Sequence, residues 1–294
     1  MKKNKKILSG SLILSATISS LREKINHRIK YKSRPPHLCT IIIGENHPSK
    51  SFLIHKTSAA QMSGMSIKNY FLPDNILPNS VVKIIEKENK NPLTDGILIQ
   101  LPLPPSLKNY QPTFTSTISP LKDIDGLHFE NIGLLFLNTP RFVPCTAKAC
   151  MLILNKIKFN LEKKHVVIIG RSLLVGKPTA QLLLNSNATI SICNRSTKRL
   201  SSITKHADLL ISATGSTHLI SKDYIKKNAT IIDVGISIIN KKIFGDVNIS
   251  PLEFPKIKNI TPVPGGIGPI TIAMLLENIW LAYLSNNNIK DPCL

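Results

Sequence analysis

The chain has 294 residues, of which 42% are hydrophobic and 19% are charged. That length allows two ordinary domains, and the composition excludes an intrinsically disordered protein. The net charge of +21 would suit nucleic acid or a membrane surface, but Lys residues are spread along the chain and aromatic residues make up only 5%, so we expect neither partner.

The N-terminal segment KKNKKILSGSLILSATISS resembles a signal peptide in its basic start and apolar run. Apolar residues nevertheless recur at helical spacing through Leu14, Ile18, Leu21, Ile25 and Ile29, and the pattern continues across charged positions. An amphipathic helix is therefore the favoured interpretation. No run approaches the ~18 uninterrupted apolar residues of a transmembrane helix.

A first series of alternating strands and helices follows. Ser49 is a candidate N-cap of its first helix, and Gly64 a candidate end. Short apolar strands separated by helices predict a parallel sheet covered on both faces. We expect strands at 39–44, 67–72 and 96–101, and helices at 49–63 and 79–90.

A second series begins near residue 141, and the break between residues 126 and 165 favours two domains over one large sheet. The fold class is therefore α/β with two α/β domains, the second of Rossmann type. We expect strands at 165–170, 188–193, 207–215 and 229–235, a helix from about Val175, and a last helix at 269–286.

The first strand of the second series leads into GRSLLVGKP, residues 170–178. A Gly-bearing turn before a helix lets the backbone approach a diphosphate, although G-x-G-x-x-G is absent and a structural turn is an open alternative. The next strand ends in Cys193-Asn194-Arg195-Ser196 with no carboxylate for a ribose 2′-hydroxyl. Arg171, Arg195 and Ser196 instead suit a 2′-phosphate, so we predict NADP over NAD.

Three polar residues of the first series are candidates for chemistry. Lys56 lies in a helix, four residues after Phe52, so that both share one face. Gln100 ends a strand, where ligand-binding residues of parallel sheets collect, and Asp125 lies in the turn KDIDG. Taken singly, each residue favours a structural interpretation over a catalytic one: Lys56 as a solvated helix lysine, Gln100 as a strand-end amide and Asp125 as a turn carboxylate.

Together these segments resemble the bifunctional methylenetetrahydrofolate dehydrogenase/methenyltetrahydrofolate cyclohydrolase family. The resemblance runs in order over almost the whole chain. Its most specific blocks are QLPLP and PVPGGIGP. The full set comprises the Lys56 helix, DGILIQLPLP (95–104), KDIDGLH (122–128), PCT (144–146), GRSLLVGKP (170–178), ADLLISATG (207–215), IIDVGI (231–236), GDV (245–247) and TPVPGGIGPIT (261–271).

The resemblance implies a catalytic and folate-binding domain at 1–140, completed by a C-terminal helix at 269–294, and an NADP-binding domain at 141–268. It implies an active-site cleft between them, a homodimer formed through the nucleotide domains, and a role in one-carbon metabolism and purine biosynthesis. It implies oxidation of 5,10-methylenetetrahydrofolate to 5,10-methenyltetrahydrofolate with NADP, then hydrolysis to 10-formyltetrahydrofolate.

The resemblance also assigns roles residue by residue. Lys56, Gln100 and Asp125 are the expected catalytic residues. The expected contacts of the folate are Phe52, Lys56, Gln100, Leu101, Asp125, Pro264, Gly265 and Gly266. The expected contacts of NADP are Gly170, Arg171, Ser172, Val175, Arg195, Ser196, Thr214, Gly215 and Ile236.

Two departures from the family pattern stand out. Phe52 replaces the usual tyrosine and removes a hydroxyl, which puts hydrolysis in more doubt than oxidation. Ala147 and Cys150 replace the usual Pro and Gly after PCT, which indicates altered packing. One alternative is therefore a dehydrogenase whose cyclohydrolase activity is weakened through Phe52. A nucleic-acid or membrane-surface binder has only the charge in its favour, and another NADP-dependent dehydrogenase leaves QLPLP unexplained.

The five cysteines stand at irregular spacings and form no C-x-x-C pair. This pattern indicates neither a disulfide framework nor a zinc site, so we expect no metal. The simplest location for such a chain is the reducing cytoplasm. The cysteines are Cys39, Cys145, Cys150, Cys193 and Cys293.

Overall fold

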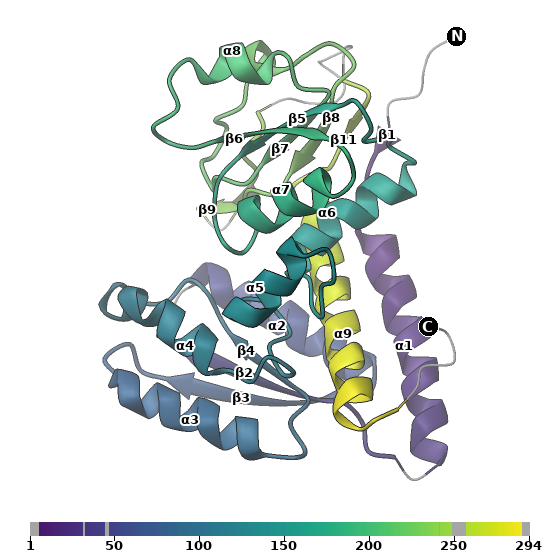
Figure 1. Ribbon diagram of the computed structural model, residues 1–294, viewed down its shortest axis with the longest axis vertical. Coiled ribbons are helices and arrows are strands. Elements are labelled where there is room, and N and C mark those ends of the chain that lie inside the picture. The colour runs from purple at the N-terminus through teal and green to yellow at the C-terminus, as the bar shows by residue number, and fades with distance from the viewer. Residues whose placement is uncertain (1–5, 32, 45–46, 241, 249–256, 290–294) are drawn as a thin grey trace. The chain divides into compact units, whose positions relative to one another are not determined.

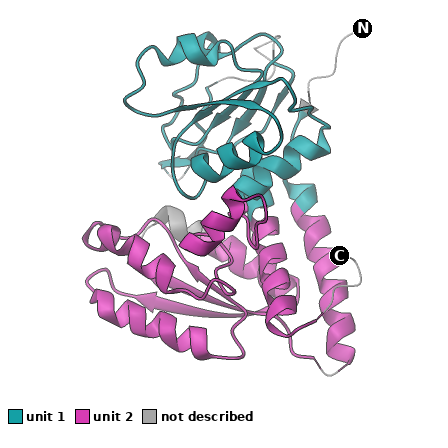
Figure 2. Ribbon diagram, in the orientation of Figure 1, with its two compact units in different colours: residues 1–13, 146–271 teal, residues 14–145, 272–294 magenta. Residues whose placement is uncertain are grey.

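The computed structural model describes residues 6–31, 33–44, 47–240, 242–248 and 257–289. Within helix α2 the side chains of residues 47–52 are outside this description. The chain divides into two compact units, coloured separately in Figure 2. Unit 1 comprises residues 1–13 and 146–271, and unit 2 comprises residues 14–145 and 272–294.

Unit 2 is built on a three-stranded parallel sheet with the order β3-β2-β4. The central strand is buried from Leu38 onward, as its run of apolar and β-branched residues predicts. All three strands confirm the predicted ones, although β4 ends at Ile99, before Gln100. The strands are β2 (His37–Ile43), β3 (Ser66–Leu72) and β4 (Gly96–Ile99).

Two of the helices, α3 and α4, cover one face of this sheet (Figure 1). Val81 and Ile85 of α3 are fully buried against Ile41 and Ile97 of the sheet, and Phe114 of α4 joins the same core. The helical segments are α2 (His47–Met62), α3 (Pro78–Lys90), η1 (Pro105–Tyr110), α4 (Gln111–Thr117) and α5 (Phe129–Phe136).

The ends of α2 test the predicted caps. The helix already begins at His47, so Ser49 lies inside its first turn and the predicted N-cap is wrong. Gly64 has φ +86°, a conformation that glycine adopts without strain, and Met65 N–H donates to Ala60 C=O across the helix end. The predicted end of the helix at Gly64 is confirmed.

Two long helices contribute to both units: α1 (Ser11–Lys30) and α9 (Ile267–Asn286). The predicted N-terminal helix is confirmed, with Leu21 and Ile25 buried, although Ile29 is exposed. Among the described residues α9 alone is long and apolar enough to cross a membrane by length and composition, and 78% of that stretch is buried. Such burial is typical of a core helix.

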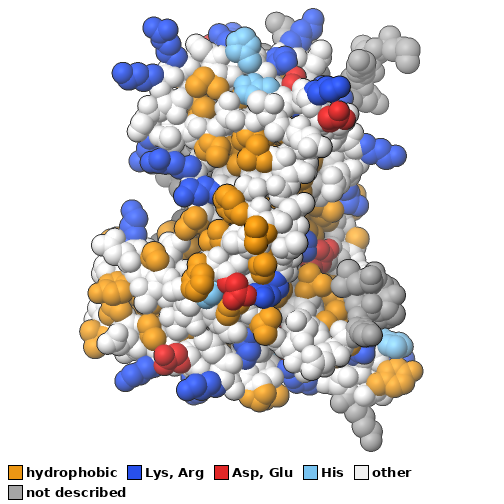
Figure 3. All heavy atoms as spheres, in the orientation of Figure 1, with side chains coloured by type: hydrophobic (Ala, Val, Ile, Leu, Met, Phe, Trp, Pro, Cys, Tyr) orange, Lys and Arg blue, Asp and Glu red, His pale blue; other side chains and the backbone are white. Residues whose placement is uncertain are grey.

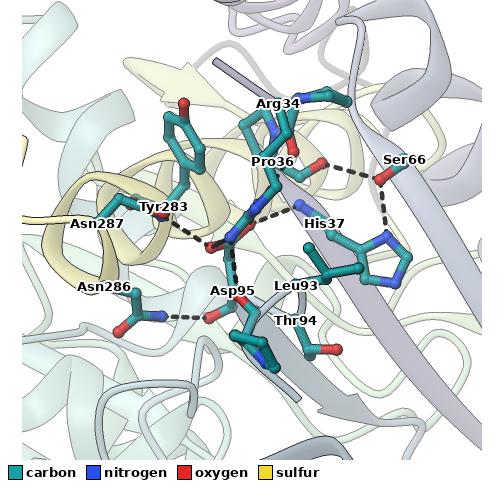
Figure 4. Close-up of polar contacts among 12 residues, drawn as sticks. Arg34, Pro36, His37, Ser66, Leu93, Thr94, Asp95, Tyr283, Asn286 and Asn287 are labelled. Atoms are coloured by element: carbon teal, nitrogen blue, oxygen red, sulfur yellow. Dashed lines mark hydrogen bonds and ion pairs between the residues drawn. The ribbon is translucent and has the colours of Figure 1, made fainter. Parts of the chain in front are cut away.

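A buried carboxylate fastens the end of α9 to the sheet of unit 2 (Figure 4). Arg34 donates to both oxygens of Asp95 at 2.6 and 2.8 Å, and His37 N–H donates to the same carboxylate. Asn286 donates to Asp95 C=O at 3.0 Å, and Asn287 to Asp95 Oδ1 at 3.3 Å. A paired charge and satisfied polar groups therefore join α9 to the starts of β2 and β4.

Unit 1 contains a six-stranded parallel sheet with the order β1-β11-β8-β7-β5-β6. Four strands confirm predicted ones, and the two-residue strands β1 and β11 were not predicted. The order reverses at β5, which has β6 on one side and β7 on the other. The strands are β1 (Lys6–Ile7), β5 (His165–Ile169), β6 (Thr189–Cys193), β7 (Leu209–Ser212), β8 (Thr230–Asp233) and β11 (Asn259–Ile260).

Smaller elements connect these strands (Figure 1). Ligands of open α/β sheets bind beyond the carboxyl ends of the strands, where the strand order reverses. That rule places a ligand at the loops after β5, β6, β7 and β8. The connecting elements are α6 (Cys145–Lys156), α7 (Gly176–Leu184), α8 (Leu200–Thr204), η2 (Lys222–Tyr224) and the antiparallel pair β9 (Ser237–Ile239) and β10 (Lys242–Phe244).

Candidate active site

Lys56 and Gln100 meet in unit 2. Lys56 Nζ donates to Oε1 of Gln100 at 3.2 Å, and both side chains are half-buried. The Gln100 amide is held in turn, because its Nε2 donates to Leu101 C=O at 2.8 Å and its backbone N–H donates to Ile41 C=O. Gln100 therefore presents a fixed acceptor to the lysine and adds no charge.

The protonation of Lys56 is shifted by its surroundings. Burial lowers the pKa of Lys56 below its ordinary value, while the nearby Asp125 and Cys145 oppose that shift by raising it. Desolvation disfavours the ammonium form, so this lysine accepts and releases a proton closer to neutral pH than a surface lysine does.

Asp125 is half-buried and lies in a tightly held turn. The next residue, Gly126, has φ +66°, and a Cβ there would lie 2.9 Å from Phe142 C=O. On its other side, Ile124 C=O accepts a hydrogen bond from Asn278 of α9, which also donates to Val143 C=O. The turn is thus fixed from both sides, and the structure places Asp125 within electrostatic range of Lys56.

Two further predicted contacts of the folate lie beside these residues in the chain. Leu101 is half-buried and directly follows Gln100. The backbone of Phe52 lies in α2, one helical turn before Lys56, but its side chain is outside the described residues.

The segment with Pro264, Gly265 and Gly266 belongs to unit 1 and directly precedes α9. Gly265 has φ +97° and open space where a Cβ would stand, whereas a Cβ on Gly266 would clash with Pro262 C=O. Gly265 C=O also accepts a hydrogen bond from Gly10 N–H at 2.7 Å. Both glycines are therefore required by the backbone, and the N-terminal segment supports this loop.

The turn after β5 has the close packing expected of a dinucleotide loop. Gly170 has φ +120°, and a Cβ there would lie 2.5 Å from Ala213 C=O. A Cβ on Gly176, where α7 begins, would clash with Gly170 C=O. Arg171 and Ser172 are exposed between these glycines, and Val175 N–H donates to Ser172 Oγ at 3.2 Å.

The remaining predicted cofactor residues follow the neighbouring strands. Arg195 and Ser196 are exposed in a turn after β6. Thr214 and Gly215 follow β7, and Ile236 follows β8 with 48% of its surface exposed. The structure thus brings all nine predicted cofactor residues to the carboxyl ends of β5, β6, β7 and β8.

No pattern in the sequence predicts a role for Asp233, Asp246 or Asn278. The two aspartates lie in the blocks IIDVGI and GDV, which were recognised only as family motifs, and Asn278 lies in an apolar helix. A polar residue inside an apolar helix was the available signal for Asn278. Among the described residues, no group of three His, Cys, Asp or Glu side chains is placed to hold a metal ion.

Comparisons with known proteins identify the family of the chain. The family model described as tetrahydrofolate dehydrogenase/cyclohydrolase, catalytic domain, matches residues 8–125, and the one described as its NAD(P)-binding domain matches residues 144–287. "Bifunctional protein FolD" of Fusobacterium nucleatum is 40% identical over 270 residues, which cover 92% of this chain and 94% of that protein.

Solved structures give the same result. The bifunctional enzyme FolD, a methylenetetrahydrofolate dehydrogenase/cyclohydrolase from Campylobacter jejuni, has a TM-score of 0.88 and 38% identity, covering 95% of this chain and 99% of that chain. The Trypanosoma brucei enzyme, solved with NADP cofactor and inhibitor, has a TM-score of 0.90 and 32% identity, covering 96% and 98%. The chain belongs to the tetrahydrofolate dehydrogenase/cyclohydrolase family.

Proposed function

We propose that Lys56, Gln100 and Asp125 carry the folate chemistry of a bifunctional enzyme. The chain oxidises 5,10-methylenetetrahydrofolate to 5,10-methenyltetrahydrofolate with NADP, and then hydrolyses this product to 10-formyltetrahydrofolate. The observation that carries the assignment is the half-buried Lys56, whose Nζ donates a hydrogen bond to Gln100 and whose pKa is lowered by burial. Nothing in the comparisons favours a weakened cyclohydrolase as the alternative.

Hydrolysis needs a proton acceptor near neutrality. Neutral Lys56 takes a proton from the water that adds to the methenyl carbon, and the resulting ammonium returns a proton to the ring nitrogen when the carbon–nitrogen bond opens. Gln100 holds Nζ in place through both protonation states, since its amide oxygen accepts from either form. General acid–base catalysis of this kind typically contributes about 10²- to 10⁴-fold.

Asp125 anchors the pterin ring in this proposal. A carboxylate accepts two hydrogen bonds from the amino and ring N–H groups of a pterin, and loss of a buried charged partner typically costs about 2–5 kcal/mol. Leu101 and Phe52 contribute apolar surface to the ring. Pro264, Gly265 and Gly266 contact the substrate and the nicotinamide through their backbone, with positive φ and open space at Gly265 as the supporting observation.

NADP binds to unit 1 at the carboxyl edge of its sheet. Gly170, Ser172 and Val175 shape the diphosphate turn, while Arg171, Arg195 and Ser196 receive the 2′-phosphate. Thr214, Gly215 and Ile236 contact the remainder of the cofactor. NADP supplies the hydride acceptor, and the contribution of the protein to that step is to hold both reacting rings in place.

The enzyme works in the cytoplasm and serves purine biosynthesis. It forms a homodimer through unit 1 of each copy. One observation supports the dimer: β6 is an edge strand of the described sheet, and its Ile192 has 44% of its surface exposed. Ile192→Lys should halve the mass measured by analytical ultracentrifugation. A variant of unchanged mass would exclude β6 as the interface.

We propose no nucleic-acid or membrane partner. Figure 3 shows the Lys and Arg side chains scattered over the visible face rather than gathered in one patch. Functionally we divide the chain into the folate part, 1–140 with the helix 269–294, and the NADP part, 141–268. The compact unit 1 additionally includes β1 at the N-terminus.

A coupled assay tests the function. With 5,10-methylenetetrahydrofolate and NADP, the purified protein should form NADPH and 10-formyltetrahydrofolate, with the methenyl intermediate appearing only transiently. Absence of NADPH with either NADP or NAD would contradict the oxidation, and lasting accumulation of the methenyl compound would contradict the hydrolysis. Arg195→Ala should raise the KM for NADP by about 10-fold or more and leave the KM for NAD unchanged, because only NADP has the 2′-phosphate.

A further inference from the structure

A buried carboxylate shapes the loop that follows β7. Asp246 is fully buried, and its Oδ2 accepts hydrogen bonds from Ser212 Oγ at 2.7 Å and Thr214 N–H at 2.8 Å. Its Oδ1 accepts from Ser216 N–H at 2.9 Å. Three donors, one at the end of β7 and two in the loop after it, thus point at one carboxylate, and the backbone curls around it as a backbone N–H nest does around an anion.

A second buried carboxylate holds the first. Asp233 ends β8, and its Oδ1 accepts from Asp246 N–H at 3.1 Å and from Gly235 N–H at 3.2 Å. Its Oδ2 accepts from Val247 N–H at 2.9 Å. Asp233 therefore fixes the backbone at Asp246 and also the backbone immediately before Ile236.

Glycines make room for both carboxylates. A Cβ on Gly235 would clash with the carboxylate of Asp246, and a Cβ on Gly245 would clash with that of Asp233. The blocks DVG and GDV are thus two halves of one arrangement, each with an aspartate and a glycine that admits the other half's aspartate. Backbone hydrogen bonds also join the DVG block to the end of β7, because Val234 N–H and Gly235 N–H donate to Ser212 C=O.

The supported loops are the ones to which the proposed function assigns cofactor contacts. Gly215 lies between the two backbone donors to Asp246 and has φ +63°. Ser237 Oγ donates to Gly215 C=O at 2.9 Å, which ties the loop after β7 to the segment carrying Ile236. A change at Asp246 therefore alters the positions of Thr214, Gly215 and Ile236 together.

We propose that Asp246 is a positioning residue for NADP, held in place by Asp233. Its carboxylate sets the loop after β7 in the conformation that receives the part of the cofactor common to NADP and NAD. The inference rests on the proposed cofactor roles of Thr214, Gly215 and Ile236. It assigns a role in cofactor affinity to a fully buried residue.

The test is Asp246→Asn, which keeps the shape but turns an amide NH2 toward N–H and O–H donors. The KM and the dissociation constant for NADP should rise by about 10-fold or more, the usual effect of losing a charge-assisted hydrogen bond. The KM for NAD should rise by the same factor. Hydrolysis of methenyltetrahydrofolate without nucleotide should stay within about 2-fold, because Lys56, Gln100 and Asp125 belong to unit 2.

Asp208→Asn is the matched control. Asp208 lies in the same unit and accepts hydrogen bonds from His165 N–H and Lys226 Nζ, but it precedes β7 and so lies at the amino end of that strand. This variant should lose stability while its KM for NADP stays within about 2-fold of the wild-type value. Equal increases in the KM for NADP in both variants would overturn the proposal.

Ser212→Ala is the second variant, in case Asp246→Asn does not fold. It removes one of the three donors and keeps the carboxylate, so the KM for NADP should rise by about 3-fold with hydrolysis unchanged. An unchanged KM, or a parallel fall of both activities, would overturn the positioning role. Failure of the proposed function is separate, because it would appear as an inactive wild-type protein or an Arg195→Ala variant with unaltered preference for NADP.

Discussion

Two buried carboxylates, Glu88 in unit 2 and Asp233 in unit 1, are held in opposite ways. In unit 2, Glu88 is fully buried; burial by itself would raise its pKa, but hydrogen bonds from Lys68, Thr94, Tyr70 and Asn91 lower it to about 2. In unit 1, burial and, to a smaller extent, the charge of Asp246 raise the pKa of Asp233 to about 6 despite hydrogen bonds from Val247 and Asp246 N–H groups. One carboxylate is paired with a cation, while the other has only neutral donors among the described residues.

The difference follows from what each carboxylate holds. Glu88 of α3 bonds to Lys68 and Tyr70 on β3 and to Thr94 before β4, so it fastens a helix to a sheet. Asp233 and Asp246 bond almost entirely to backbone N–H groups of loops. Glu88, which is paired with a cation, therefore stabilises unit 2. Asp233 and Asp246, which accept mainly from backbone N–H groups, shape the loops of unit 1 to which we assign the cofactor.

The largest effect is expected at the one lysine of unit 2 that we place in the chemistry. Lys56→Met should lower the rate of methenyltetrahydrofolate hydrolysis by about 10²- to 10⁴-fold, because the proton acceptor is lost. Lys68→Met is the control, since Lys68 bonds to Glu88 instead, and it should lower the free energy of unfolding while hydrolysis is kept. The hydrolysis rates of both variants are measured by stopped-flow decay of methenyl absorbance. Hydrolysis above a tenth of the wild-type rate in Lys56→Met would exclude the proposed role.

The second-largest effect is expected at Glu88, the carboxylate paired with a cation, and it tests the structural role of that side chain. Glu88→Ala should lower the free energy of unfolding by about 2–4 kcal/mol, because the buried Thr94 hydroxyl and the half-buried Tyr70 hydroxyl lose their acceptor and the partly exposed Lys68 loses its partner. Urea unfolding measures the change. The KM for NADP of the folded variant should be unchanged, and a rise in that KM would break the distinction between the two carboxylate types.

Proton linkage provides a third test, with opposite signs for Glu88 and Asp233. The folded-state pKa of Glu88, about 2, lies below its ordinary value, so its contribution to stability is present above about pH 4.5 and is lost as pH falls toward 2. The folded-state pKa of Asp233, about 6, lies above its ordinary value, so its contribution is present below about pH 4 and is lost as pH rises through 6. Each contribution is at most about 3 kcal/mol.

Urea unfolding of the wild-type protein and Asp233→Asn between pH 4 and pH 6.5 isolates the second contribution. The variant lacks the titrating carboxyl, so the wild-type free energy of unfolding should fall relative to that of the variant as pH rises. A constant difference between the two proteins across this range would show that Asp233 does not titrate there.

The smallest effect is expected at Phe52. Phe52→Tyr adds a single hydroxyl at a position one helical turn before Lys56, which Gln100 already holds, so hydrolysis should quicken by no more than about 10-fold, the value of one neutral hydrogen bond. The rate of methenyl decay measures it, with NADPH formation as the internal reference. A larger increase would show that Phe52 limits the second reaction.

The sequence predicted the elements whose signal is local. Apolar runs indicated the buried strands, and the strand-end position of Gln100 with helical Lys56 anticipated the contact observed between them. The expected strand at 207–215 was too long, because β7 ends at Ser212, where the backbone turns around Asp246.

What was missed depends on distant pairings. β1 has two residues and becomes a strand only by pairing with β11, some 250 positions later, so it leaves no periodic signal. Asp233 and Asp246 come from separate turns, and only their meeting explains why glycines neighbour both. Ser49 had the residue type of an N-cap, but the helix began earlier, at His47.

The central claim is that unit 2 carries the folate chemistry and unit 1 carries the cofactor affinity. The most direct test measures two quantities, the rate of methenyltetrahydrofolate hydrolysis and the dissociation constant for NADP, in both Lys56→Met and Asp246→Asn. We expect a crossed result, in which Lys56→Met loses hydrolysis and binds NADP normally, while Asp246→Asn hydrolyses normally and binds NADP at least about 10-fold more weakly. Proportional loss of both quantities in both variants would exclude this division between the units.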